Sequence, residues 1–69
     1  MKYVFKCNNK DLDFDMLDYQ IHNLFFNYYG LFFDEGQEKI EFDFEEELNE
    51  EDYNLLKEVL KDYNIGERK

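Results

Sequence analysis

Hydrophobic residues change their spacing along this 69-residue chain, and each change predicts an element. From Lys2 to Cys7 apolar and polar residues alternate, which is typical of a strand with one buried face. From about residue 11 to 29 apolar residues recur every three or four positions, so we expect an amphipathic helix. Gly30 follows at the place of a left-handed helix cap. The apolar stripe of this helix comprises Phe14, Leu17, Ile21, Leu24, Phe25 and Tyr28.

The second half of the chain predicts a hairpin and another helix. Two strand-like runs, 31–34 and 39–44, surround a turn that contains glycine. Asn49 is a favourable N-cap, and the acidic residues after it suit the first turn of a helix over 50–63, which Gly66 follows. We therefore predict one α+β domain over residues 1–69, of order β-α-β-β-α, with two helices on one face of a three-stranded sheet. The predicted core comprises Phe14, Leu17, Ile21, Phe42, Phe44, Leu56 and Leu60.

Charge is distributed unevenly along the chain. Residues 1–10 carry +3, residues 11–52 carry −14 and residues 53–69 carry +1, which together make the net charge of −10. The stretch EKIEFDFEEELNEED at 38–52 holds nine acidic residues and one basic residue, Lys39. Self-repulsion within such a block opposes compaction, so we expect the block to have a use.

The predicted strand over 39–44 arranges part of this charge in a row. If its apolar residues face the core, Glu41, Asp43 and Glu45 must face away, because strand side chains alternate. Successive carboxylates would lie about 6.6–6.8 Å apart, and a nucleic-acid strand presents a comparable row of negative charges. The pattern favours an inhibitor that occupies the basic groove of a nucleic-acid-binding protein. The candidate partner-binding residues are Asp34, Glu35, Glu38, Glu41, Asp43, Glu45, Glu46, Glu47, Glu50 and Glu51.

Other interpretations of the acidic block stay open at this stage. Charge can serve solubility alone, and Lys2 and Lys6 would neutralise Glu41 and Asp43 if the first and last strands pair. The block would also suit an antitoxin or immunity protein that masks a basic toxin, or an acidic interaction module without mimicry. Direct binding of nucleic acid is disfavoured by the sign of the charge.

The first predicted helix has apolar residues on a second side, namely Leu12, Met16, Tyr19 and Phe26. A helix that is apolar on two sides is buried on two sides. One interpretation is that this second side packs against the other helix or lies partly in solvent. The alternative is a homodimer or partner interface built on Tyr19 and Phe26, because aromatic residues are enriched at such interfaces.

Catalytic and metal-binding motifs are weak in this sequence. The acids from Asp11 to Asp15 begin like a calcium loop, but Met16 and His22 stand where that loop needs Gly and Glu. The lone Cys7 and His22 would pair only if the tertiary structure brought them together. We therefore predict a protein that is not an enzyme and has no metal or cofactor. The unpaired thiol suits the cytoplasm, and no apolar run is long enough to span a membrane.

In size and charge the chain resembles acidic DNA-mimic inhibitors of phages and mobile elements, including anti-restriction, anti-CRISPR and uracil-glycosylase-inhibiting proteins. The resemblance rests on length and the −10 net charge, covers no motif and transfers no functional residue. It implies a phage or mobile-element origin, action in the host cytoplasm and a basic protein as the target.

Overall fold

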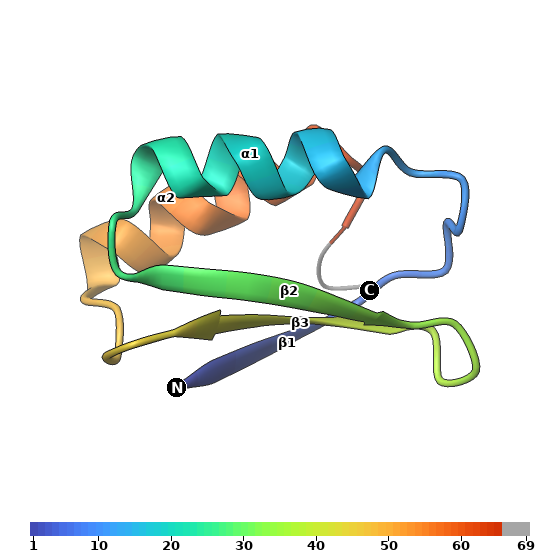
Figure 1. The fold of residues 1–69 in the computed structure, drawn as a ribbon, viewed down its shortest axis with the longest axis horizontal. Coiled ribbons are helices and arrows are strands. Elements are labelled where there is room, and N and C mark those ends of the chain that lie inside the picture. Colours follow the sequence, from blue (N-terminus) through green and yellow to red (C-terminus); the bar gives the residue numbers. More distant parts are fainter. Residues whose placement is uncertain (66–69) are drawn as a thin grey trace.

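The computed structural model describes residues 1–65 and confirms the predicted α+β class and order of elements. The strands form one antiparallel sheet in the order β1-β3-β2, so β3 lies in the middle. Both helices cover the same face of this sheet (Figure 1). The elements are β1 (Lys2–Lys6), α1 (Phe14–Leu24), β2 (Tyr28–Asp34), β3 (Lys39–Phe44) and α2 (Glu50–Lys61).

The core lies between the sheet and the helices and is built on β3. Ile40, Phe42 and Phe44 are completely buried, so the predicted register of β3 is confirmed. The other predicted core residues that are completely buried are Leu17, Ile21, Leu56 and Leu60. Phe14 was predicted in the core but is only partly buried. It is the first residue of α1, and its ring stacks on Phe33 of β2 with the centroids 4.8 Å apart.

Helix α1 is shorter at both ends than the predicted span of 11–29. It begins at Phe14 because Asp13 is the N-cap, where Oδ1 accepts a hydrogen bond of 3.1 Å from the N–H of Met16. It ends at Leu24 because Phe25 has an extended backbone, with φ −130° and ψ 115°. The Phe25 ring then packs edge-on against Phe44, 5.4 Å away.

Strand β2 begins at Tyr28, earlier than the predicted start at residue 31. Tyr28 is buried opposite Phe44, and its hydroxyl donates a hydrogen bond of 2.6 Å to Asp18 Oδ1. The prediction of Gly30 as a helix cap is wrong, because this residue lies inside β2 directly after a break in register. The short run of aromatic residues fits a helix and a strand equally well by spacing. Pairing with β3 decides between them.

The predicted hairpin and second helix are confirmed, with small differences in their bounds. The Asn49 side chain accepts a hydrogen bond of 2.7 Å from the N–H of Asp52 and caps α2. Helix α2 ends at Lys61, two residues before the predicted end at 63, and β1 ends one residue early at Lys6. The predicted stop at Gly66 lies outside the described residues.

Candidate protein-binding surface

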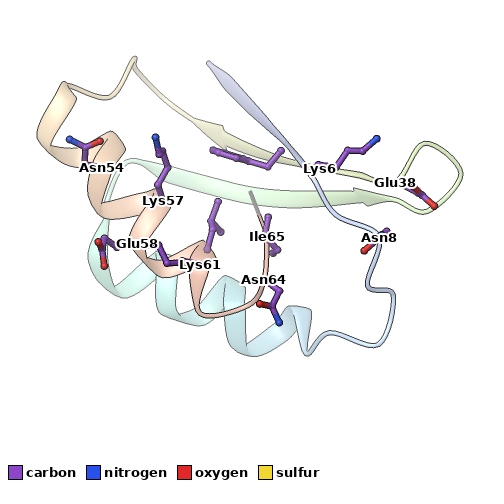
Figure 2. Close-up of a pocket in the computed structure, with 11 residues that line it drawn as sticks. Lys6, Asn8, Glu38, Asn54, Lys57, Glu58, Lys61, Asn64 and Ile65 are labelled. Atoms are coloured by element: carbon purple, nitrogen blue, oxygen red, sulfur yellow. The ribbon is translucent and has the colours of Figure 1, made fainter. Parts of the chain in front are cut away.

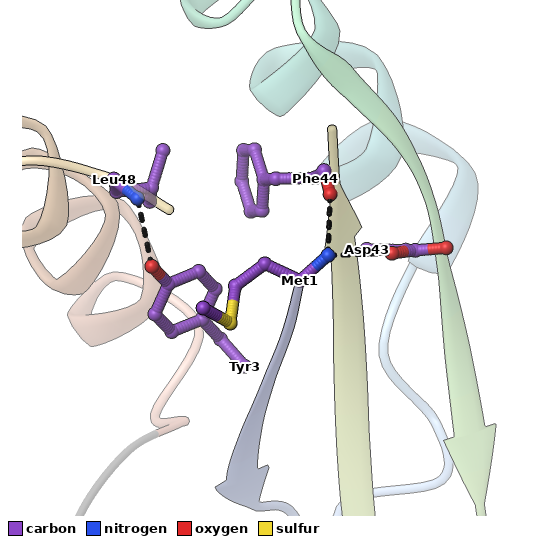
Figure 3. Close-up of polar contacts among 5 residues, drawn as sticks. All are labelled: Met1, Tyr3, Asp43, Phe44 and Leu48. Atoms are coloured by element: carbon purple, nitrogen blue, oxygen red, sulfur yellow. Dashed lines mark hydrogen bonds and ion pairs between the residues drawn. The ribbon is translucent and has the colours of Figure 1, made fainter. Parts of the chain in front are cut away.

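The outward carboxylates of β3 lie beside positive charges. Because β1 pairs with β3, Lys2 stands opposite Asp43. The α-amino group of Met1 also lies 3.7 Å from Asp43 Oδ1 (Figure 3). Along β3 itself, Lys39 Nζ lies 3.3 Å from Glu41 Oε2. Of the three carboxylates in the predicted row, Glu41 and Asp43 are therefore not isolated negative charges.

The sheet face turned away from the helices consequently has mixed charge. Its acidic side chains are Asp34, Glu41 and Asp43, and its basic groups are Lys2, Lys6, Lys39 and the α-amino group. Exposed apolar side chains, among them Val4 and Phe32, lie between these charges. Cross-strand neutralisation by Lys2 and Lys6 is thus present only in part: Lys2 stands opposite Asp43, but Lys6 stands opposite Lys39, and the ion pair of Glu41 comes from Lys39 of its own strand. No continuous row of bare carboxylates runs along β3.

The uncompensated charge lies where β3 leads into α2. We call this segment the acidic loop; it comprises Glu45, Glu46, Glu47, Glu50, Glu51 and Asp52. Between residues 45 and 56 the chain has no basic residue. Within residues 1–65, none of these six carboxylates forms an ion pair. All but Asp52, which is half-buried, are exposed to solvent.

The backbone of the acidic loop is attached firmly to the core. Leu48 buries its side chain, and its N–H donates a hydrogen bond of 2.8 Å to the hydroxyl of Tyr3 (Figure 3). The N–H of Glu45 donates to the carbonyl of Asn27 at 2.8 Å. With the Asn49 cap, these contacts hold the loop at both ends and in the middle. The carboxylates are therefore presented on an ordered backbone.

The other predicted acids lie at the hairpin between β2 and β3, at the far end of β3 from the acidic loop (Figure 1). Glu35 forms an ion pair of 3.2 Å with Lys10, and Asp34 Oδ1 accepts a hydrogen bond of 3.2 Å from the N–H of Gln37. Glu38 is exposed and has a positive φ of 54°. The length of β3, about 20 Å at 3.4 Å per residue, separates these acids from the loop. The predicted set is thus divided between two ends of the molecule.

Tyr19 and Phe26 both lie in solvent. Tyr19 is 63% exposed on α1, and Phe26 is 99% exposed just beyond its end. Phe26 follows the extended residue Phe25, and neighbours in an extended chain point to opposite sides, so burial of Phe25 turns Phe26 outward. Of this second apolar side, Leu12 packs partly against the core, whereas Met16, Tyr19 and Phe26 are exposed and remain available for an interface.

Titratable groups elsewhere form no recognisable catalytic arrangement in residues 1–65. The buried thiol of Cys7 is close to the carbonyl of Asn9, whereas His22 lies on α1 beside Asp18. Burial, and then the hydrogen bond to Asp18 and its charge, raise the pKa of the Tyr28 hydroxyl above its ordinary value. No group of three or more His, Cys, Asp or Glu side chains in this part of the chain is placed to hold a metal ion.

Sequence reasoning missed a groove between β1 and α2, which Figure 2 shows. We call it the β1–α2 groove; its volume is about 1140 Å³. Lys6 lines it from β1, and Lys57 and Lys61 line it from α2. The sequence contains one signal for it, because both ends of the chain are mildly basic, but only the fold brings those ends together.

None of the helices in residues 1–65 has the length and apolar character needed to cross a membrane. The acidic loop is a negative surface, the β1–α2 groove is a locally basic one, and Tyr19 and Phe26 are exposed aromatic residues. No protein-family model, curated protein or solved structure matches this chain.

Proposed function

We propose that this protein is an acidic inhibitor whose acidic loop occupies the basic groove of a nucleic-acid-binding protein. The observation that supports this most is a set of six carboxylates within residues 45–52, which have no ion pair in the described chain and are held on an anchored backbone. Lysine and arginine side chains of such a groove bind phosphates. Carboxylates presented together attract the same side chains and exclude the nucleic acid.

A role in stabilising the fold accounts for only three of the six carboxylates in the acidic loop. Glu50, Glu51 and Asp52 lie in the first turn of α2, where the helix dipole stabilises negative charge. Glu45, Glu46 and Glu47 precede the N-cap and gain nothing from that dipole. Three adjacent exposed carboxylates repel one another, which opposes folding. These three residues are therefore the ones whose presence a binding role explains best.

The remaining predicted acids have weaker parts in this proposal. Glu41 and Asp43 extend the negative surface along β3, but Lys39 and the α-amino group reduce their charge. An exposed ion pair contributes about 0.2–1 kcal/mol, so no single carboxylate dominates. The summed field of the loop accelerates association with a basic partner and weakens as salt is added.

The test compares two variants that have the same net charge. In the first, Glu45, Glu46 and Glu47 are changed to glutamine. In the matched control, the exposed residues Asp11, Asp15 and Glu58 are changed to asparagine or glutamine. Each protein is immobilised and exposed to an extract of its native host at low salt, and retained proteins are identified by mass spectrometry. Circular dichroism verifies that each variant folds.

We expect the wild type and the control to retain a nucleic-acid-binding protein that the loop variant does not retain. Excess duplex DNA or RNA should displace it, and raised salt should weaken its retention. Equal retention by the loop variant would show that Glu45, Glu46 and Glu47 serve solubility only. A retained basic toxin that nucleic acid does not displace would replace the proposal with an antitoxin or immunity function.

A further inference from the structure

Strand β1 lies at the edge of the sheet, and its register shows which backbone groups remain open. At one end of the pairing with β3, the α-amino group of Met1 donates to the carbonyl of Phe44 at 2.7 Å, and the N–H of Phe44 donates to the carbonyl of Met1 at 2.8 Å. At the other end, the N–H of Cys7 donates to the carbonyl of Glu38 at 2.9 Å. The odd-numbered residues of this segment therefore direct their backbone N–H and C=O groups toward β3.

Bonded and non-bonded pairs alternate in an antiparallel ladder. Tyr3 and Phe5 therefore bond to their partners in β3, whereas Lys2, Val4 and Lys6 direct their N–H and C=O groups away from the sheet. No hydrogen bond within residues 1–65 engages the outward groups of these three residues. The open edge can accept one further strand.

The β1–α2 groove lies directly beside this edge (Figure 2). Phe5, Leu60 and Ile65 contribute a buried apolar lining, and Lys61 of α2 lines the groove together with Lys57. Lys57 Nζ also lies 5.3 Å from the centre of a tyrosine ring of the same helix. A strand paired with β1 would place alternate side chains toward the groove and the others toward the outer face of the sheet.

The charge around this edge favours an acidic occupant. Lys57 and Lys61 of α2 line the groove and Lys6 borders it at the edge of β1, whereas its acidic lining residues are Glu38 and Glu58. On the outer face, Lys2 and Lys6 flank Val4 along β1. On the side of β1 that pairs with β3, Lys2 stands opposite Asp43 and Lys6 stands opposite Lys39.

We propose that an extended acidic segment of a partner protein pairs with β1 as a fourth strand and lies along the β1–α2 groove. Main-chain hydrogen bonds to Lys2, Val4 and Lys6 supply the attachment, and alternate carboxylates meet the flanking lysines. A second copy of this chain suits the edge less well than an acidic segment does. Antiparallel pairing of two β1 strands centred on Val4 would set Lys2 of one copy opposite Lys6 of the other, and like charges there repel.

The test uses a capped seven-residue peptide of alternating glutamate and valine, labelled with a fluorophore and titrated with the protein in an anisotropy assay. Val4→Pro removes an N–H that points away from β3, and proline is tolerated in edge strands at such positions. We expect it to weaken peptide binding at least about tenfold, since it removes a main-chain bond and disturbs its neighbours. Val4→Thr, the matched control, keeps the N–H and should bind like the wild type. Circular dichroism compares the folds of both variants.

A second comparison leaves the protein unchanged. The same peptide with its internal amides N-methylated keeps every charge but loses the N–H groups of its backbone. We expect the wild type to bind it at least about tenfold more weakly than the parent peptide. Equal binding of the two peptides would show attraction by charge alone and overturn strand addition. Unchanged affinity in a folded Val4→Pro variant, or no binding of the parent peptide to the wild type, would overturn it as well.

Discussion

Changing Tyr3 to phenylalanine tests how the acidic loop is held. The Tyr3 hydroxyl accepts the hydrogen bond from the N–H of Leu48, and this N–H has no other partner in residues 1–65. The variant keeps the ring, which packs against Phe44 at 5.8 Å and Tyr53 at 5.5 Å between centroids. The perturbation is therefore confined to one hydrogen bond between β1 and the loop.

The expected loss of stability follows from the setting of that bond. The contact is partly buried, so water compensates the freed N–H only in part. A bond of this kind contributes about 0.5–1.5 kcal/mol to the free energy of unfolding. In a domain of this size, a loss of about 1 kcal/mol lowers the melting temperature by about 4–8 °C.

Thermal and urea unfolding, followed by far-UV circular dichroism, measure this loss. The matched control is Tyr19→Phe, because the Tyr19 side chain is 63% exposed and its hydroxyl has no hydrogen bond within the described residues. Its melting temperature should stay close to that of the wild type. Amide exchange at Leu48 should accelerate in the Tyr3 variant alone. Identical melting temperatures for the two variants would refute the assigned role of the Tyr3 bond.

Two further predictions concern other parts of the molecule. Burial and then Asp18 raise the pKa of Tyr28 in the folded state, so its hydroxyl ionises at lower pH in the unfolded chain than in the folded one. The contribution of the neutral hydroxyl to the free energy of unfolding is therefore intact below pH of about 10 and is lost as the pH rises above it. Tyr28→Phe should lower stability by about 1 kcal/mol or more at neutral pH and flatten the alkaline decline in urea unfolding; an unchanged decline would contradict this. If Tyr19 and Phe26 form a homodimer interface, sedimentation equilibrium should give a dimer for the wild type and a monomer for Phe26→Ser. A monomeric wild type would exclude that homodimer.

Local sequence patterns predicted the structure correctly wherever a pattern fitted only one type of element. Alternation in β3 assigned Phe42 to the core and Glu41 to the opposite face, because strand side chains have a period of two residues. The Asn49 cap placed the start of α2 correctly, since its side chain satisfies an N–H of the first turn. The class of the fold and the order of its elements followed from these patterns.

The spacing of apolar residues did not predict the structure where it fitted both a helix and a strand. By spacing, Phe25 and Tyr28 continue the helical stripe of α1. In the structure, Phe25 has an extended backbone and Tyr28 lies in β2. Their rings complete the core against Phe44, which is distant in sequence. Helix α1 therefore ends early for a tertiary reason, and Phe26 is left in solvent as a consequence.

The same division applies to the candidate surfaces. The sequence alone located the acidic block and the basic ends of the chain, because charge is a property of composition. Only the tertiary structure decided which charges remain unpaired: the pairing of β1 with β3 brings the α-amino group of Met1 to Asp43, whereas no basic group reaches Glu45, Glu46 or Glu47 in an ion pair within residues 1–65. The β1–α2 groove likewise exists only in the folded chain, because its lysines come from opposite ends of the sequence, and Coulomb interactions depend on distance in space.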